Sequence, residues 1–197
     1  MAQRVGGGWI VAAVAAALAL LAADAPAKSM GKPRSRPVDT VIVHSLGGPD
    51  CREGRRYFGA IDGDARTWAA RFARLPIVSI HYVVGRDGQV ASGIPEAQAA
   101  SHAIGWNQRS IGIELVNNGD GMDPFPVVQM EALLRLVRAI RTRHPGVTPA
   151  RVLRHSDVDH TTFPEVRHGA ACTAHRRKLD PGDAFPWAAF TGALARD

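Results

Sequence analysis

Three short segments of the chain are apolar or β-branched at nearly every position, and this pattern predicts buried strands. They span residues 40–43, 77–84 and 110–116. A strand that is apolar on both faces is typical of the centre of a covered sheet. The run Gly-Arg-Asp-Gly at 85–88 predicts a hairpin turn, and Val152-Leu153 predicts a fourth, shorter strand.

Two segments have the periodicity of amphipathic helices. The first is expected to begin at the N-cap Asp64 and to end before Pro76. The second, over residues 126–144, has Met130, Leu133, Leu134, Val137 and Ile140 on its apolar side. Its polar side is predicted to carry Gln129, Glu131, Arg135, Arg138 and Arg141. Strands and helices therefore alternate along the chain.

The first 37 residues differ in composition from the rest. Residues 9–23 are almost wholly apolar and rich in Ala, and a single Arg precedes them. This pattern predicts a secretory signal peptide over 1–25, with an uncleaved anchor as the alternative. Residues 26–37 read as a solvated linker and 38–197 as one domain. We expect an exported protein, periplasmic or secreted, with no stable membrane span after cleavage.

The formal net charge of +6 suits a protein that works near anionic polymers such as cell-wall glycans. Nucleic acid is not an expected partner, because the basic residues are scattered and aromatic residues are few. Cys51 and Cys172 fit an oxidising compartment. If they pair, the bond ties the loop after His44 to the segment after His155; two free buried thiols are the alternative.

Candidate chemistry gathers in the last third of the chain. His155 lies in Arg-His-Ser-Asp, and Lys178 and Asp180 lie in Arg-Lys-Leu-Asp-Pro-Gly. Imidazole and carboxylate are good zinc ligands, and a catalytic zinc usually takes three protein ligands and one water. His44, at the end of a predicted strand, is the best third candidate. Glu114 is a carboxylate within a buried strand, which is costly unless it has a partner or a function.

Several motifs occur in an order that resembles the zinc-dependent N-acetylmuramoyl-L-alanine amidases of type 2, whose fold is shared with peptidoglycan recognition proteins and phage amidase lysozymes. The resemblance runs from Val38 to Trp187. The motifs are Val-Ile-Val-His, Ser-Ile-His-Tyr, Gly-Arg-Asp-Gly, Ser-His-Ala, Ser-Ile-Gly-Ile-Glu-Leu-Val-Asn, His-Ser-Asp, Arg-Lys-Leu-Asp-Pro-Gly and Phe-Pro-Trp. Each motif is weak alone, but the set in this order is specific.

The resemblance implies an α/β (α+β) fold with a central mixed sheet flanked by helices. It assigns one Zn²⁺ to His44, His155 and Asp180, with Glu114 as the acid/base residue and Lys178 as the cation near the oxyanion. The implied reaction cleaves the amide between N-acetylmuramic acid and L-alanine in peptidoglycan or a muropeptide, by a protein expected to be a monomer. Further groove residues that could contact substrate are His81, His102, Trp106 and Asn107, although Asn107 also suits a turn.

One departure from the family is the long segment 158–176 between the last two motifs. It leaves open whether His160, His168, His175 or Cys172 replaces Asp180 as a ligand, since imidazole and thiolate also bind zinc. Two other functions are weighed against the enzyme. One is a peptidoglycan-binding module of the same fold without catalysis, and the other is an exported metal-buffering protein.

Overall fold

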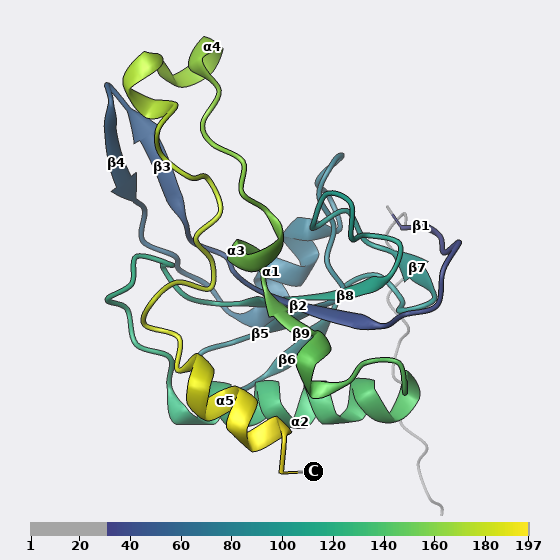
Figure 1. Cartoon of the computed structure of the whole chain (residues 1–197). Helices are drawn as coiled ribbons and strands as arrows, with labels where there is room; N and C mark the ends of the chain where they lie inside the picture. The colour runs from purple at the N-terminus through teal and green to yellow at the C-terminus, as the bar shows by residue number, and fades with distance from the viewer. Residues whose placement is uncertain (1–30, 197) are drawn as a thin grey trace, which may run out of the picture.

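The centre of the molecule is a mixed five-stranded sheet with strand order β6-β5-β8-β2-β9 (Figure 1). The computed structural model describes residues 31–196, so the expected signal peptide and the first residues of the expected linker lie outside it. The strands are β2 (Thr40–Ser45), β5 (Tyr82–Val84), β6 (Val90–Ser92), β8 (Ser110–Leu115) and β9 (Val152–Arg154). Only β6 is antiparallel to its neighbour. The predicted mixed sheet is confirmed.

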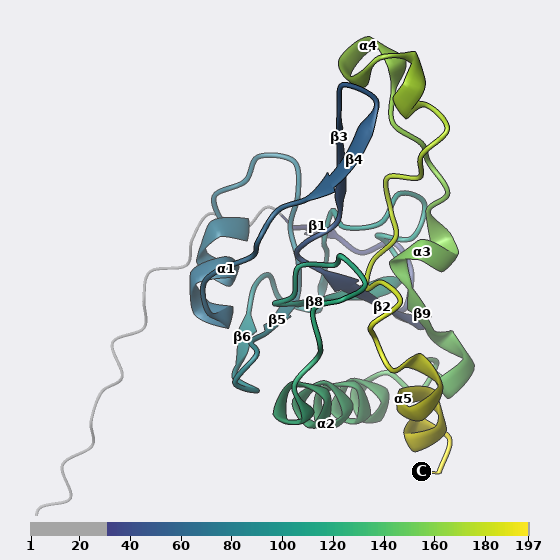
Figure 2. The same cartoon turned by 90° about the vertical axis from the view of Figure 1, so that its left-hand side faces the viewer.

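Helices cover both faces of this sheet (Figures 1 and 2). The long helix α2 (Val127–Arg143) and the C-terminal α5 (Trp187–Leu194) pack on the face that contains Val41, Val43 and Ile111. Helix α1 (Ala65–Phe72) packs on the other face with Ile80 and Val83. Alternation along the strands therefore places His44 and Glu114 on the face away from α2.

The helix predictions are confirmed in position. Asp64 caps α1, because its Oδ1 accepts a hydrogen bond from the backbone N–H of Thr67 at 2.7 Å. Gln129, predicted on the wet side of α2, is instead fully buried. Its amide donates to the carbonyl oxygens of Val84 and Val116 at 3.0 and 3.2 Å, so it satisfies carbonyl groups at the ends of two strands.

The predicted strand at 77–84 is mostly wrong, since β5 begins only at Tyr82. Ile77 is 80% exposed, so the apolar run is not a buried strand at its start. The backbone N–H of Ser79 bonds to the carbonyl of Ser101, in a loop and not in the sheet. The strand begins where Tyr82 pairs with Ser92 and Ile113 on neighbouring strands, so contacts beyond the local segment set its start.

The expected solvated linker is packed against the domain from residue 31 onward. Strand β1 (Lys32–Pro33) pairs with β7 (Gln98–Ala99). Arg34 donates to the carbonyl oxygens of Glu96, Asn107, Gln108 and Ser110 at 2.6–3.1 Å. Four carbonyls converge on one guanidinium, so this segment is part of the fold.

Two segments form an arm that projects from one end of the sheet (Figures 1 and 2). One is the hairpin of β3 (Pro49–Arg52) and β4 (Arg55–Phe58), and the other holds α4 (Glu165–His168) and the 3-10 turn η2 (Ala170–Cys172). The Cys51–Cys172 disulfide joins them, which confirms the pairing. The remaining short elements are the 3-10 turn η1 (Pro149–Arg151) and helix α3 (His155–Val158). Within residues 31–196, no helix has the length and apolar character needed to cross a membrane.

Candidate metal and catalytic site

Three side chains that are far apart in the sequence meet at the carboxyl ends of β2 and β9. His44 lies near the end of β2, His155 follows β9 directly, and Asp180 lies in the loop before α5. Oδ2 of Asp180 is 3.1 Å from Nδ1 of His44 and 2.9 Å from Nδ1 of His155. All three residues are buried, and their ligand atoms lie within 4.8 Å of one another. They form one cluster of the size that a metal ion needs.

The hydrogen bonds around His102 fix the tautomer of His44. The Ser110 hydroxyl donates to the carbonyl of Trp106 at 2.8 Å, so Ser110 Oγ accepts from Nε2 of His102 at 3.1 Å. Nδ1 of His102 then accepts from Nε2 of His44 at 2.9 Å. Nδ1 of His44 is therefore left without a proton, and its lone pair faces Asp180.

That arrangement suits a bound cation. Burial lowers the pKa of His44 to about 4, so the ring is neutral near pH 7. A nitrogen lone pair pointing at a carboxylate oxygen is unfavourable unless a positive charge lies between them. Two imidazoles and one carboxylate are a zinc donor set. Metal-bound histidines usually donate a hydrogen bond from their other ring nitrogen, as Nε2 of His44 does to His102. The residues present therefore fit the metal.

Glu114 lies beside the cluster because of the sheet register. In the parallel pair β2–β8, Glu114 is directly opposite His44. Its Oε2 is enclosed and has no hydrogen-bond partner among the described residues. Burial, and then the negative charge of Asp180, raise the pKa of Glu114 to about 8, and Lys178 opposes this shift. A strongly perturbed carboxyl group at a cleft is typical of an acid/base residue.

The cluster opens into a cleft of about 770 Å³. Glu114 and Lys178 line it, together with all three residues of the cluster. Ile77 and Val78 form an exposed apolar part of the wall, which explains why the start of the predicted strand faces solvent. The cleft thus offers polar chemistry at its base and an apolar surface at its rim, as ligand sites commonly do.

The four residues predicted to contact substrate have different positions. His102 and Asn107 line the cleft, whereas His81 and Trp106 are not among its lining residues. His81 is fully buried: its Nδ1 accepts from the N–H of Gly112, so its Nε2 carries the proton and donates to the carbonyl of residue 98. In this structure the His81 ring supports the sheet and does not line the cleft, and its contact with substrate stays a prediction.

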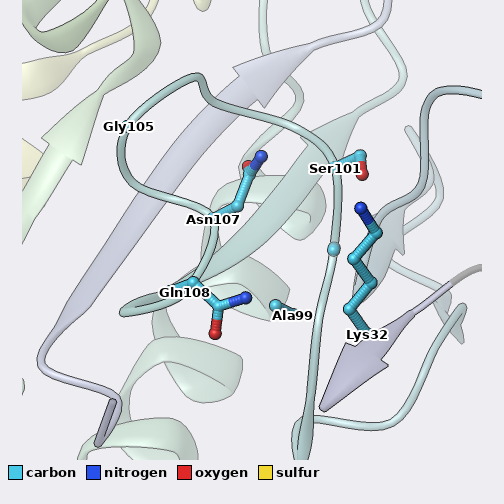
Figure 3. Close-up of a pocket in the computed structure, with 7 residues that line it drawn as sticks. Lys32, Ala99, Ser101, Gly105, Asn107 and Gln108 are labelled. Carbon is cyan, nitrogen blue, oxygen red and sulfur yellow. The ribbon is translucent and has the colours of Figure 1, made fainter. Parts of the chain in front are cut away.

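The turn that carries His102 is held by its own hydrogen bonds. Oδ1 of Asn107 accepts from the backbone N–H groups of His102 and Ala103 at 3.0 and 2.8 Å, so Asn107 is a turn former as well as a cleft residue. Residues of this turn also line a smaller pocket of about 280 Å³ (Figure 3). Its lining includes Ser101, Asn107 and Lys32, whose side chain extends toward Ser101.

The inserted segment supplies no member of the cluster. Cys172 is bonded to Cys51, and Nδ1 of His168 donates to the carbonyl of Cys51. Neither His160 nor His175 belongs to the buried cluster. Among the described residues, Asp180 is therefore the third donor that the geometry favours.

Asp159 is a site residue that the sequence reasoning missed. It is buried, lines the cleft, and has Oδ2 3.7 Å from Nε2 of His155. That ring nitrogen has no hydrogen-bond partner among the described residues. At 3.7 Å the two atoms are farther apart than in a hydrogen bond, so Asp159 acts on this ring only through its negative charge. The signal available in the sequence is the i, i+4 spacing from His155.

A His-His-Asp donor set beside a perturbed carboxyl group, at the base of an open cleft, is the arrangement of a metal-assisted hydrolase. The chain belongs to the N-acetylmuramoyl-L-alanine amidase family, whose sequence pattern matches residues 34–183. This match covers the sheet, the cluster and Glu114. The predicted family and amidase activity are confirmed.

Individual relatives agree with the family. The chain is 28% identical over 176 residues to 1,6-anhydro-N-acetylmuramyl-L-alanine amidase AmpD of Enterobacter cloacae, covering 83% of this chain and 84% of the relative. It is 33% identical over 138 residues to the endolysin of Enterobacteria phage T3, covering 67% of this chain and 83% of the relative.

Solved structures show the same fold. A crystal structure of an AmpD derivative superposes with a TM-score of 0.56 at 25% identity, covering 84% of this chain and 90% of that one. The amidase AmiD from E. coli, in complex with anhydro-N-acetylmuramic acid-L-Ala-D-gamma-Glu-L-Lys, has a TM-score of 0.57 at 23% identity. That match covers 82% of this chain and 60% of AmiD, and it supports the fold alone.

Proposed function

We propose that this chain is a zinc-dependent hydrolase that cleaves the amide between the lactyl group of N-acetylmuramic acid and the first L-alanine of the stem peptide. The observation that carries the proposal is the convergence of His44, His155 and Asp180, in which Nδ1 of His44 lies 3.1 Å from the Asp180 carboxylate and its Nε2 is engaged by His102. His155 faces the same oxygen at 2.9 Å. These three residues hold one Zn²⁺.

The metal, when bound, polarises the scissile carbonyl and makes a water molecule more acidic. The chain's own residues supply the proton transfers. Glu114 takes a proton from the attacking water as the new C–O bond forms, and it delivers a proton to the amide nitrogen as the C–N bond breaks. Its enclosed Oε2 is free to accept that proton. Lys178 lines the same cleft and stabilises the negative charge that develops on the carbonyl oxygen.

The substrate lies in the cleft that contains the cluster. His102 and Asn107 are the predicted contact residues that line this cleft, and they face the bound muropeptide in the proposal. His102 has a second role, because it holds the ring of His44 in place at 2.9 Å. Trp106 lies under Arg109, whose Cζ is 5.6 Å from the ring centroid. Because Trp106 does not line the cleft, we do not include it among the residues that contact substrate.

We place the enzyme outside the cytoplasm, as a monomer with a cleaved signal peptide over residues 1–25. The Cys51–Cys172 disulfide supports an oxidising compartment, and the net charge of +6 supports attraction to an anionic wall. Nucleic acid is not a proposed partner, because the basic residues are scattered and aromatic residues are few. Because Arg34 is bonded to the domain, the mature domain begins near residue 31 and not at residue 38.

Digestion of purified sacculi tests the proposal. Free stem peptides, detected by mass spectrometry, should appear with the zinc-loaded protein and disappear after chelation. His155→Ala should lose both bound zinc and turnover, whereas Glu114→Gln should keep zinc, measured by atomic absorption, and lose turnover. Retention on sacculi without released peptides would instead make the protein a binding module. Release of peptides by a fully metal-stripped protein would refute the zinc site.

A further inference from the structure

The arm formed by the β3–β4 hairpin and the α4–η2 segment carries four arginines, Arg52, Arg55, Arg56 and Arg167, beside three carboxylates, Asp50, Glu53 and Glu165. Arg55, Arg56 and Arg167 are exposed, and none of them forms an ion pair within residues 31–196. Arg52 is also exposed and stacks on Tyr57, with its Cζ 4.6 Å from the ring centroid. Unpaired guanidinium groups gathered on one projection are available to an external anion.

The arm is built to hold its shape although it contains almost no core. Its buried apolar cluster consists of Cys51, Cys172 and Phe163. Gly54, at the turn of the hairpin, lies so close to Ala171 that a Cβ atom there would be 2.8 Å from the Ala171 side chain. The disulfide and this close packing keep the hairpin and the inserted segment together, so the hairpin arginines and Arg167 stay on one projection.

The base of the arm is a wall of the catalytic cleft. Pro49, where β3 begins, lines the cleft, as do Thr161, near the start of the inserted segment, and Arg177, directly after it. The backbone N–H of Arg177 bonds to the carbonyl of Thr161 at 2.9 Å, which closes this base. A four-residue strand extends roughly 13 Å, so the arginines near the hairpin turn lie well beyond the cleft itself.

We propose that the arm is a second binding surface, which holds the carboxylates of neighbouring stem peptides when the substrate is polymeric peptidoglycan. This inference rests on the proposed function, because it concerns which form of the substrate the cleft receives. A soluble muropeptide carries only its own stem peptide. A polymer presents further carboxylates at intervals along its strands, and planar guanidinium groups bind carboxylates in a paired geometry.

The test compares two triple variants with equal loss of charge. In the arm variant, Arg55, Arg56 and Arg167 are replaced by Gln; these side chains are exposed and form no ion pair within residues 31–196. The control variant carries Arg66→Gln, Arg74→Gln and Arg196→Gln, which are exposed and likewise form no ion pair within residues 31–196; they lie in α1, just after α1 and after α5. Each variant should show an intact disulfide and the thermal midpoint of the parent protein.

Binding to sacculi stripped of phosphate polymers is measured by co-sedimentation in a Glu114→Gln background, and turnover is measured separately in the active protein. Exposed charge contacts each change affinity by a factor of about two to three, so the arm variant should bind sacculi about tenfold more weakly. It should digest them correspondingly more slowly at low substrate, and both effects should shrink in high salt. Turnover of a soluble muropeptide should stay unchanged, and the control variant should match the parent.

Three results would overturn the proposal: equal sacculus binding by the arm variant, an equal loss in the control variant, or an equal loss of soluble turnover. A second binding assay uses vesicles containing phosphatidylglycerol in place of sacculi. If they bind through the same arginines while sacculi do not, the partner is a membrane and the proposal is wrong. Failure of the parent protein to cleave either substrate would remove the proposed function, whereas the sedimentation result would still decide the role of the arm.

Discussion

Replacing Glu114 by Gln should weaken catalysis and strengthen the fold. Burial raises the pKa of this carboxyl from 4.5 to about 8, so the folded metal-free protein takes up a proton that the unfolded chain does not hold between these two pH values. Stability therefore falls as pH rises through this range. Each pKa unit is worth about 1.4 kcal/mol, so the carboxyl costs roughly 3 kcal/mol at pH 7. A glutamine of similar shape carries no charge and should recover most of that cost.

Urea unfolding of chelator-treated protein measures this difference. At pH 4.5 the two proteins should have similar free energies of unfolding, because the folded parent then holds a proton on Glu114. At pH 8 the variant should be more stable by a few kcal/mol. Its kcat on soluble muropeptide should nevertheless fall about 10²- to 10⁴-fold, the usual contribution of an acid/base residue, with zinc retained.

Parallel pH profiles of stability for the two proteins would refute the reasoning, since the pH dependence would then come from other groups. A variant with normal turnover would remove Glu114 from the mechanism even if the stability difference were found. The two measurements therefore separate the electrostatic environment of the residue from its chemical role.

Three other predictions follow from the site and the arm. His155→Ala should abolish zinc retention, because one of three donors is lost; metal analysis after dialysis measures this, and full occupancy would contradict it. His102→Ala should weaken zinc binding about 10- to 100-fold in a chelator competition, because His44 loses the partner of its Nε2; an unchanged affinity would make the contact incidental. Replacing Cys51 and Cys172 together by Ser should lower the free energy of unfolding by about 5 kcal/mol for a sequence separation of 121, and a much smaller loss would show that the unfolded chain is already compact there.

Much of the fold was predictable where local pattern and burial agree. The runs that became β2 and β8 are apolar on both faces, and the period of α2 matches its buried side, so tertiary contacts reinforced what each segment favoured alone. The cluster was predictable because strand ends deliver His44 and His155 to one edge of a parallel sheet. Glu114 was conspicuous as a charge within a buried strand.

The remaining features could not be predicted, because they depend on contacts with residues that are distant in the sequence. Gln129 looks like a surface residue of a helix, yet two strand-end carbonyls require a donor at its position. Arg34 lies in a stretch with the composition of a linker, but four carbonyl groups from distant loops converge on it. His81 and His102 occur in similar motifs, and only the packing of the sheet places one in the interior and the other at the cleft.

The register of β2 and β8 sets His44 and Glu114 directly opposite each other on adjacent strands. Neighbouring strands are held about 4.8 Å apart by their backbone hydrogen bonds, so this spacing does not depend on any loop. The segments that shape the cleft walls can therefore lengthen, shorten or gain a disulfide without moving the reactive pair. Changes in these segments can therefore alter which peptidoglycan fragments such an enzyme accepts, while the positions of His44 and Glu114 stay the same.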